Sequence, residues 1–114
     1  MHEVSLMEQT LEIAIAYAQE QNATRIHHLK MQIGEISGVV PDALNFAFDV
    51  VTRGTIAEGA TLKIEMVSIL CHCPDCDRNF HPVDTYIYEC PDCQHLSAKI
   101  VSGREIELSS LEVS

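Results

Sequence analysis

Apolar residues along the chain follow one spacing that is typical of helices and another that is typical of strands. Between Met7 and Ala18 they recur every three or four positions, which predicts a helix. Ser5 and Glu8 match a capping box, so we expect this helix to begin at Ser5. A second apolar stripe with helical spacing follows Pro41. Since proline is favoured in the first turn of a helix, we expect this second helix to begin near Pro41. The pattern therefore predicts two helices, each with one apolar face.

Apolar and polar residues alternate in three other segments, which predicts strands. These segments are residues 27–33, 61–70 and 106–113. The alternation slips by one position at Ser109 and Ser110, which indicates a β-bulge. Together with the helices, these strands predict an α+β fold in which two helices pack on one face of a small β-sheet.

Residues 71–95 interrupt both spacings. This segment holds every cysteine, three of the six histidines and few large apolar side chains. We expect a zinc-ribbon-like lobe over residues 71–102, inserted before the last strand of an α+β domain formed by residues 1–70 and 103–114. A lobe this short cannot be stabilised by an apolar core alone, so it needs an additional cross-link.

Four of the cysteines form two C-x2-C pairs, Cys73 with Cys76 and Cys90 with Cys93, and thirteen residues separate the pairs. Two such turns facing each other supply four thiolates to one tetrahedral ion, which is typical of structural zinc. Zinc contributes about 10–16 kcal/mol to folding in small peptides, which is ample for this lobe. Because four sulfurs leave no open position for water, the site favours structure over hydrolysis.

Two alternatives to zinc stay open on these residues. One is that the cysteines are ordinary reduced thiols. The other is iron in a rubredoxin-like electron carrier, since four thiolates suit both metals. The C-x2-C turns of rubredoxin-like sites usually carry glycine directly after the second cysteine. This chain has Asp77 and Gln94 at those two positions. Zinc is therefore the preferred interpretation.

The fifth cysteine and the nearby histidines have simpler interpretations. We expect Cys71 to be a small buried residue at the end of a strand, with competition for the metal as the alternative. His72, His81 and His95 are expected to form hydrogen bonds or to face solvent rather than to bind the metal.

The chain is acidic, with 17 acidic residues against 7 basic residues and a formal net charge of −10. The basic residues are scattered, which disfavours nucleic acid and anionic membranes as partners and favours cations or a protein with a basic surface. No apolar run reaches membrane-spanning length, and the first residues lack the positive charge of a secretory signal. We therefore expect a cytoplasmic protein, whose cysteines stay reduced and bind metal.

The first three residues, Met1, His2 and Glu3, offer a second metal site. The terminal amine, the backbone nitrogen of His2 and its imidazole would chelate one ion in fused rings, a ligand set that favours square-planar Ni(II) or Cu(II). Glu3 would complete the set through its backbone nitrogen or carboxylate, or would orient His2. Copper binds such ligands more tightly than nickel, so they do not identify the metal. Exposure at a chain end suits a metal that is passed on.

Several short motifs keep their order and spacing with those of one family over essentially the whole chain. They are Met-His-Glu at 1–3, Ile-Gly-Glu at 33–35, Arg-Gly-Thr at 53–55, Ala-Glu-Gly-Ala at 57–60, the two C-x2-C pairs, and Val-Ser-Gly-Arg-Glu at 101–105. The sequence thereby resembles the HypA/HybF family of nickel metallochaperones for NiFe-hydrogenase maturation.

The resemblance implies that Met1, His2 and Glu3 hold Ni(II) as transient cargo and that the four paired cysteines hold structural Zn(II). It implies that the protein works with the GTPase partner HypB and delivers nickel to the hydrogenase large-subunit precursor. Some relatives also serve urease maturation. In some relatives an aspartate in the loop after Ile-Gly-Glu contacts nickel, but Val40 stands at that position here and Asp42 lies two residues later. Oligomeric state stays open between a monomer and a homodimer.

A zinc-ribbon adaptor without a second metal is the alternative to nickel delivery. On that interpretation the N-terminus is inert, and the chain acts through protein contacts alone. An enzyme is disfavoured, because the sequence has no evident nucleophile–base set and no phosphate-binding loop.

Overall fold

The structure is a computed structural model that describes residues 2–84, 86–96 and 99–114. The chain forms two compact units, each assembled from segments that are distant in sequence. The first unit contains the residues up to Gln32, Gly38–Glu65 and Glu107–Ser114, and the second contains Ile33–Ser37 and Met66–Ile106. The part of the chain described here has no helix long and apolar enough to cross a membrane.

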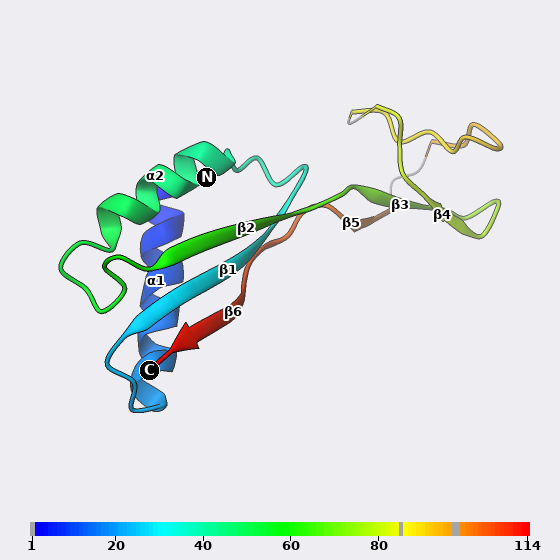
Figure 1. Ribbon diagram of the computed structural model, residues 1–114. Coiled ribbons are helices and arrows are strands. Elements are labelled where there is room, and N and C mark those ends of the chain that lie inside the picture. Colours follow the sequence, from blue (N-terminus) through cyan, green and yellow to red (C-terminus); the bar gives the residue numbers. More distant parts are fainter. Residues whose placement is uncertain (1, 85, 97–98) are drawn as a thin grey trace. The chain divides into compact units, whose positions relative to one another are not determined.

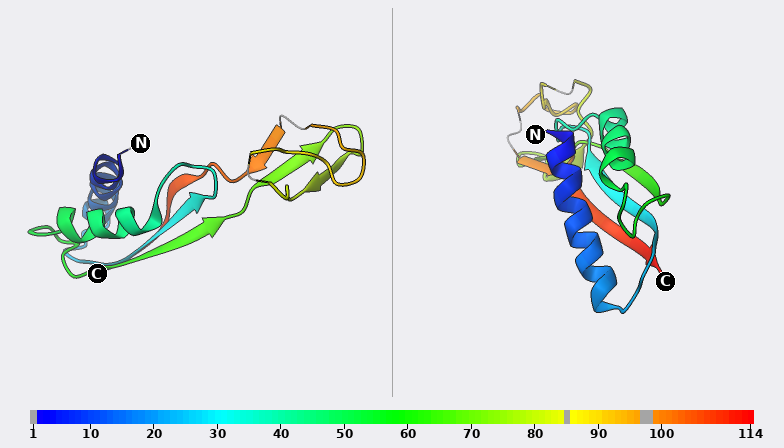
Figure 2. Two further views of the ribbon diagram at one scale, coloured as in Figure 1. Left: turned by 90° about the horizontal axis from the view of Figure 1, so that it is seen from above. Right: turned by 90° about the vertical axis from the view of Figure 1, so that its left-hand side faces the viewer.

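Two helices and most of one sheet form the first unit. The helices lie on the same face of the three-stranded sheet, whose strand order is β2-β1-β6 (Figure 1, Figure 2). The elements are α1 at Glu3–Glu20, β1 at Ile26–Gly34, α2 at Pro41–Val51, β2 at Thr61–Val67 and β6 at Ile106–Val113. The predicted α+β class is confirmed.

The core of the first unit lies between the helices and the sheet. Met7 of α1, Leu44 of α2 and both Leu29 and Met31 of β1 are almost completely buried. Burial of each such side chain stabilises the fold by about 1.5–3 kcal/mol relative to exposure. Pro41 is in the first turn of α2, as predicted, because its fixed φ suits that position and its missing N–H needs no partner there.

The opposite face of the sheet is polar. Glu65 of β2 accepts hydrogen bonds from the ammonium group of Lys30 at 2.8 Å and from the amide of Gln32 at 3.1 Å. The Lys30 contact, followed by the Gln32 contact, holds the pKa of Glu65 below its usual value. Polar side chains on alternate positions of β1 thus leave only the helix-covered face apolar.

The first helix begins earlier than the sequence predicts. Residue His2 is the N-cap, and its Nδ1 accepts a hydrogen bond from the Val4 N–H at 3.3 Å. The carbonyl of His2 accepts the first helical bond from the Leu6 N–H at 3.0 Å. The capping box predicted at Ser5 is therefore wrong, because Ser5 lies inside the first turn of a helix whose N-cap is His2.

The single strand predicted over residues 61–70 is in fact two strands. β2 ends at Val67, and β3 occupies Leu70–Cys73. Between them, Ile69 donates its N–H to the carboxylate of Glu35 at 3.1 Å, and Val67 accepts the Glu35 N–H at 2.9 Å. Both the backbone and the side chain of Glu35 therefore bind the chain at the break between β2 and β3.

A second sheet builds the other unit, with the order β4-β3-β5 and antiparallel pairing on both sides of β3. Its flanking strands are β4 at Arg78–Phe80 and β5 at Lys99–Ser102. The core of this unit is small and rich in sulfur. Its buried residues are Ile69, Cys71, Cys73, Phe80 and Cys90.

The last strand, β6, has the phase slip that its sequence predicts. Ser109 and Ser110 are both exposed, whereas Leu108 and Leu111 on either side are half-buried. The hydroxyl of Ser109 donates to the carbonyl of Lys30 at 3.1 Å, which ties the irregular position to β1. The apolar residues on both sides of the slip thereby face the same way.

Candidate metal sites

The sulfur atoms of Cys73, Cys76, Cys90 and Cys93 all lie within 4.8 Å of one another. The Sγ atoms of Cys73 and Cys93 are 3.5 Å apart, and those of Cys76 and Cys90 are 3.9 Å apart. A tetrahedral ion with Zn–S bonds of about 2.3 Å would place its sulfurs about 3.8 Å apart. The four side chains therefore fit one tetrahedral ion with little rearrangement.

Two similar turns position these sulfurs. Cys73 is the last residue of β3, and the turn after it returns the chain as β4. In the other turn, Cys90 donates its N–H to the carbonyl of His95 at 2.9 Å and accepts the Gln94 N–H at 2.9 Å. Asp77 and Gln94 have positive φ values of 50° and 61°. Both residues adopt the left-handed backbone conformation that glycine usually occupies, so the missing glycines do not distinguish zinc from iron.

Grouping four thiols changes their acidity in opposite directions. The backbone N–H of Cys93 lowers the pKa of Cys90, so negative charge is favoured on that sulfur. The neighbouring sulfur of Cys93, followed by burial, raises the pKa of Cys76 to about 12. Several thiolates at this spacing repel one another, and a bound divalent cation would remove that penalty.

The other candidate ligands near this cluster have hydrogen-bond partners or are buried. His72 Nδ1 lies 2.9 Å from Asn79 Oδ1, His81 Nδ1 lies 2.8 Å from the Ile69 carbonyl, and His95 Nδ1 lies 3.0 Å from Asp75 Oδ2. Cys71 is fully buried in β3, and burial raises its pKa. It does not belong to the four-sulfur group found among the described residues. The hydrogen bonds expected of the three histidines and the burial expected of Cys71 are therefore present in the structure.

The predicted nickel ligands lie at the start of α1. His2 is exposed and Glu3 is half-buried, while Met1 lies outside the described residues. One carboxylate oxygen of Glu3 accepts the backbone N–H of Val40 at 3.3 Å. Val40 is therefore adjacent to the predicted site through its backbone N–H. Sequence reasoning missed this contact, because thirty-seven positions separate the two residues.

Two of the motifs that carry the family resemblance meet within the second unit. Gly34 donates its N–H to the Glu105 carbonyl at 2.7 Å, and Ile36 donates to the Gly103 carbonyl at 2.8 Å. The side chain of Glu105 accepts the N–H of Gly103 at 2.8 Å. Ile-Gly-Glu and Ser-Gly-Arg-Glu are thus parts of one structural junction rather than ligand sets, a role that no local spacing in the sequence reveals.

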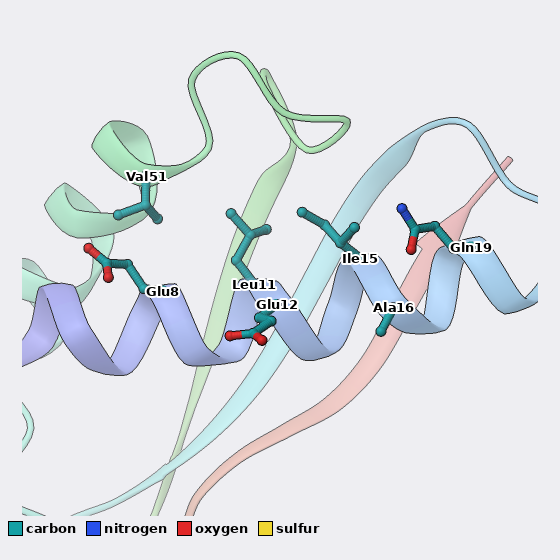
Figure 3. Close-up of a pocket in the computed structure, with 7 residues that line it drawn as sticks. All are labelled: Glu8, Leu11, Glu12, Ile15, Ala16, Gln19 and Val51. Carbon is teal, nitrogen blue, oxygen red and sulfur yellow. The ribbon is translucent and has the colours of Figure 1, made fainter.

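A shallow groove runs along α1 in the first unit (Figure 3). Its aliphatic side chains come from Leu11, Ile15 and Val51, and the carboxylates of Glu8 and Glu12 lie beside them. The groove contains none of the predicted metal ligands.

Comparison with known families gives a match over nearly the full length. The family described as "Hydrogenase/urease nickel incorporation, metallochaperone, hypA" matches residues 1–113. The chain is 58% identical over 113 residues to the hydrogenase maturation factor HypA of Picosynechococcus sp., covering 99% of both chains. It is 41% identical over 112 residues to that of Roseiflexus sp., covering 98% of this chain and 91% of the relative.

Solved structures agree with the fold. The solution structure of the Ni metallochaperone HypA from Helicobacter pylori matches with a TM-score of 0.70 and 25% identity, covering 99% of this chain and 97% of the other. A second solution structure of a HypA protein matches with a TM-score of 0.76 and 26% identity, covering 100% and 97%.

Fold, sulfur cluster and relatives together define a metallochaperone, not an enzyme. The chain belongs to the HypA family of hydrogenase maturation factors. Its role is nickel incorporation during hydrogenase maturation, which implies interaction with the hydrogenase maturation machinery. The resemblance noted in the sequence is thereby confirmed.

Proposed function

We propose that this chain captures one Ni(II) ion with the amine of Met1, the imidazole and backbone nitrogen of His2, and Glu3. The observation that carries the proposal is the position of His2, whose exposed imidazole lies at the very start of α1. Amine, deprotonated amide and imidazole nitrogens form fused chelate rings, and they favour a square-planar ion such as Ni(II). An exposed ligand set also leaves room for a partner to take the ion.

Glu3 supports this site in a second way. Its carboxylate reaches the Val40 N–H, which links the first turn of α1 to the loop before α2. Negative charge in the first turn of a helix is also favourable, and it would offset the charge of a nearby cation. We propose that one carboxylate oxygen of Glu3 supports the nickel set while the other holds the start of α1 in place through the Val40 N–H.

The four paired cysteines complete the proposal as a Zn(II) site. Cys73 and Cys90 are buried, whereas Cys76 is half-buried and Cys93 is exposed. Zinc held by four thiolates would supply cohesion to a unit whose apolar core is small. The ion would have no open coordination position, so it would stabilise this unit and take no part in nickel transfer chemistry.

The partners proposed for delivery are the GTPase HypB and the hydrogenase large-subunit precursor, with urease maturation as a further role. The family description names both hydrogenase and urease nickel incorporation, which supports the hydrogenase and urease roles. The net charge of −10 favours a partner with a basic docking surface. All five cysteines are free thiols, which suits work in the reducing cytoplasm.

Replacing His2 with alanine tests the nickel proposal. We expect His2→Ala to weaken nickel binding by at least a hundredfold, because the change removes the imidazole that closes the chelate. Isothermal titration of zinc-loaded, untagged protein with nickel measures the loss, and zinc content should stay at one ion per chain.

A chain with one extra residue before Met1 provides the second arm of this experiment. It keeps His2 but moves the free amine, so we again expect a large loss of nickel affinity. Unchanged nickel binding in both variants would eliminate the N-terminal site and leave a zinc-ribbon adaptor as the better interpretation.

A further inference from the structure

His2 has a structural role in addition to its proposed role as a ligand. It is the N-cap of α1, with extended backbone angles of φ −76° and ψ 125°. Its Nδ1 accepts the N–H of Val4 at 3.3 Å, so the lone pair of that nitrogen points at the backbone of the first turn. Serine, threonine, aspartate and asparagine are the preferred N-cap residues, and histidine is an unusual choice.

The same ring nitrogen is the one that a chelate needs. A ring through the metal, the His2 backbone nitrogen, Cα, Cβ, Cγ and Nδ1 has six members and closes without strain. Nε2 lies on the far side of the imidazole and cannot close such a ring with the backbone of its own residue. Because one lone pair cannot bind both a proton donor and a metal, the Val4 N–H and the chelated ion exclude each other.

We propose that nickel capture and capping of α1 compete for Nδ1 of His2, so that loading releases the Val4 N–H and unloading restores the cap. The inference rests on the proposed function, since it assumes a chelate at His2. The loss of an N-cap corresponds to about a three- to fivefold change in an equilibrium constant, and nickel affinity is lowered by that factor.

The rest of the first turn has contacts that nickel does not displace. The Glu3 carboxylate still accepts the Val40 N–H, and the Leu6 N–H still donates to the His2 carbonyl at 3.0 Å. The competition is therefore confined to one hydrogen bond. It also favours delivery, because the cap supplies a partner for Nδ1 at the moment when the ion leaves.

A pair of proline substitutions tests the competition. Val4→Pro removes the competing N–H, and proline is tolerated in the first turn of a helix. Ser5→Pro places the same ring one residue later but keeps the Val4 N–H, so it is the matched control. With zinc-loaded full-length protein, we expect Val4→Pro to bind nickel three- to fivefold more tightly than the natural chain and Ser5→Pro to stay within twofold of it.

Equal nickel affinities in the two proline variants would overturn the inference. Should either variant lose its helical circular dichroism, hydrogen exchange at the Val4 amide of the natural chain decides the question. Exchange should become several-fold faster at saturating nickel, and unchanged or slower exchange would count against the competition. Nickel binding that His2→Ala leaves unchanged would instead remove the proposed function, whereas equal proline variants together with a large loss in His2→Ala would remove only the competition.

Discussion

We expect Cys73→Ser to abolish zinc binding and to unfold the second unit. Cys73 is fully buried at the end of β3, and its sulfur lies 3.5 Å from that of Cys93. Three of the five buried residues in the core cluster of this unit are cysteines, so little apolar surface remains to hold the cluster without an ion. Structural zinc contributes about 10–16 kcal/mol in small peptides, which exceeds the whole stability of many domains. Metal analysis should fall from one zinc per chain to near zero, with rapid proteolysis of residues 66–106.

Cys71→Ala is the matched control for this experiment. Cys71 is in the same strand and equally buried, but it lies outside the group of four sulfurs. We expect the variant to keep one zinc per chain and to lose about 1 kcal/mol through the small cavity that it creates. Full zinc content in Cys73→Ser, or equal zinc loss in both variants, would contradict the four-thiolate site. Red protein with stoichiometric iron would contradict zinc itself.

We expect Gly34→Ala to destabilise the second unit strongly. A Cβ at this position would lie 2.0 Å from the carbonyl oxygen of Gly103 and 2.5 Å from the backbone nitrogen of Arg104. Both are backbone atoms, and the hydrogen bond from Gly34 to the Glu105 carbonyl holds them close. Since the junction must open to admit one methyl group, we expect a loss of about 3 kcal/mol or more in the free energy of unfolding. Chemical denaturation with zinc bound measures it.

Gly38→Ala separates this clash from the general effect of adding a side chain. Gly38 has a φ of +83°, and its added Cβ would have no atom within 4 Å. The cost there is only the strain of a left-handed alanine, about 1–2 kcal/mol. A similar loss of stability in both variants would mean that the junction between Gly34 and Gly103 is not tightly packed.

The family motifs divide into one for which we propose nickel binding and others that hold the fold. Met-His-Glu places an exposed imidazole at the start of a helix. Ile-Gly-Glu and Ser-Gly-Arg-Glu close the second unit through backbone contacts. In Arg-Gly-Thr, the hydroxyl of Thr55 donates to the Thr52 carbonyl at 2.7 Å and accepts the Ala57 N–H at 3.1 Å, which shapes a turn. A motif therefore does not identify a metal ligand until its contacts are known.

The sequence by itself determined the two helices, the strands of the main sheet and the set of four cysteines. Burial periodicity and the spacing of two residues in a turn are local properties, and they are readable without knowledge of the rest of the fold. Pro41 marked the start of α2 for the same reason, because its ring restricts its own φ.

Only the tertiary structure decided where α1 begins, where the strand after Thr61 breaks and what Glu3 contacts. The break is bound by Glu35, thirty-four positions from Ile69, and the start of α1 is tied to Val40, thirty-seven positions from Glu3. Each of these hydrogen bonds joins segments that meet only after the chain has folded. The local spacing of residues carries no information about these long-range contacts, since the partner of a short motif can lie anywhere along the chain.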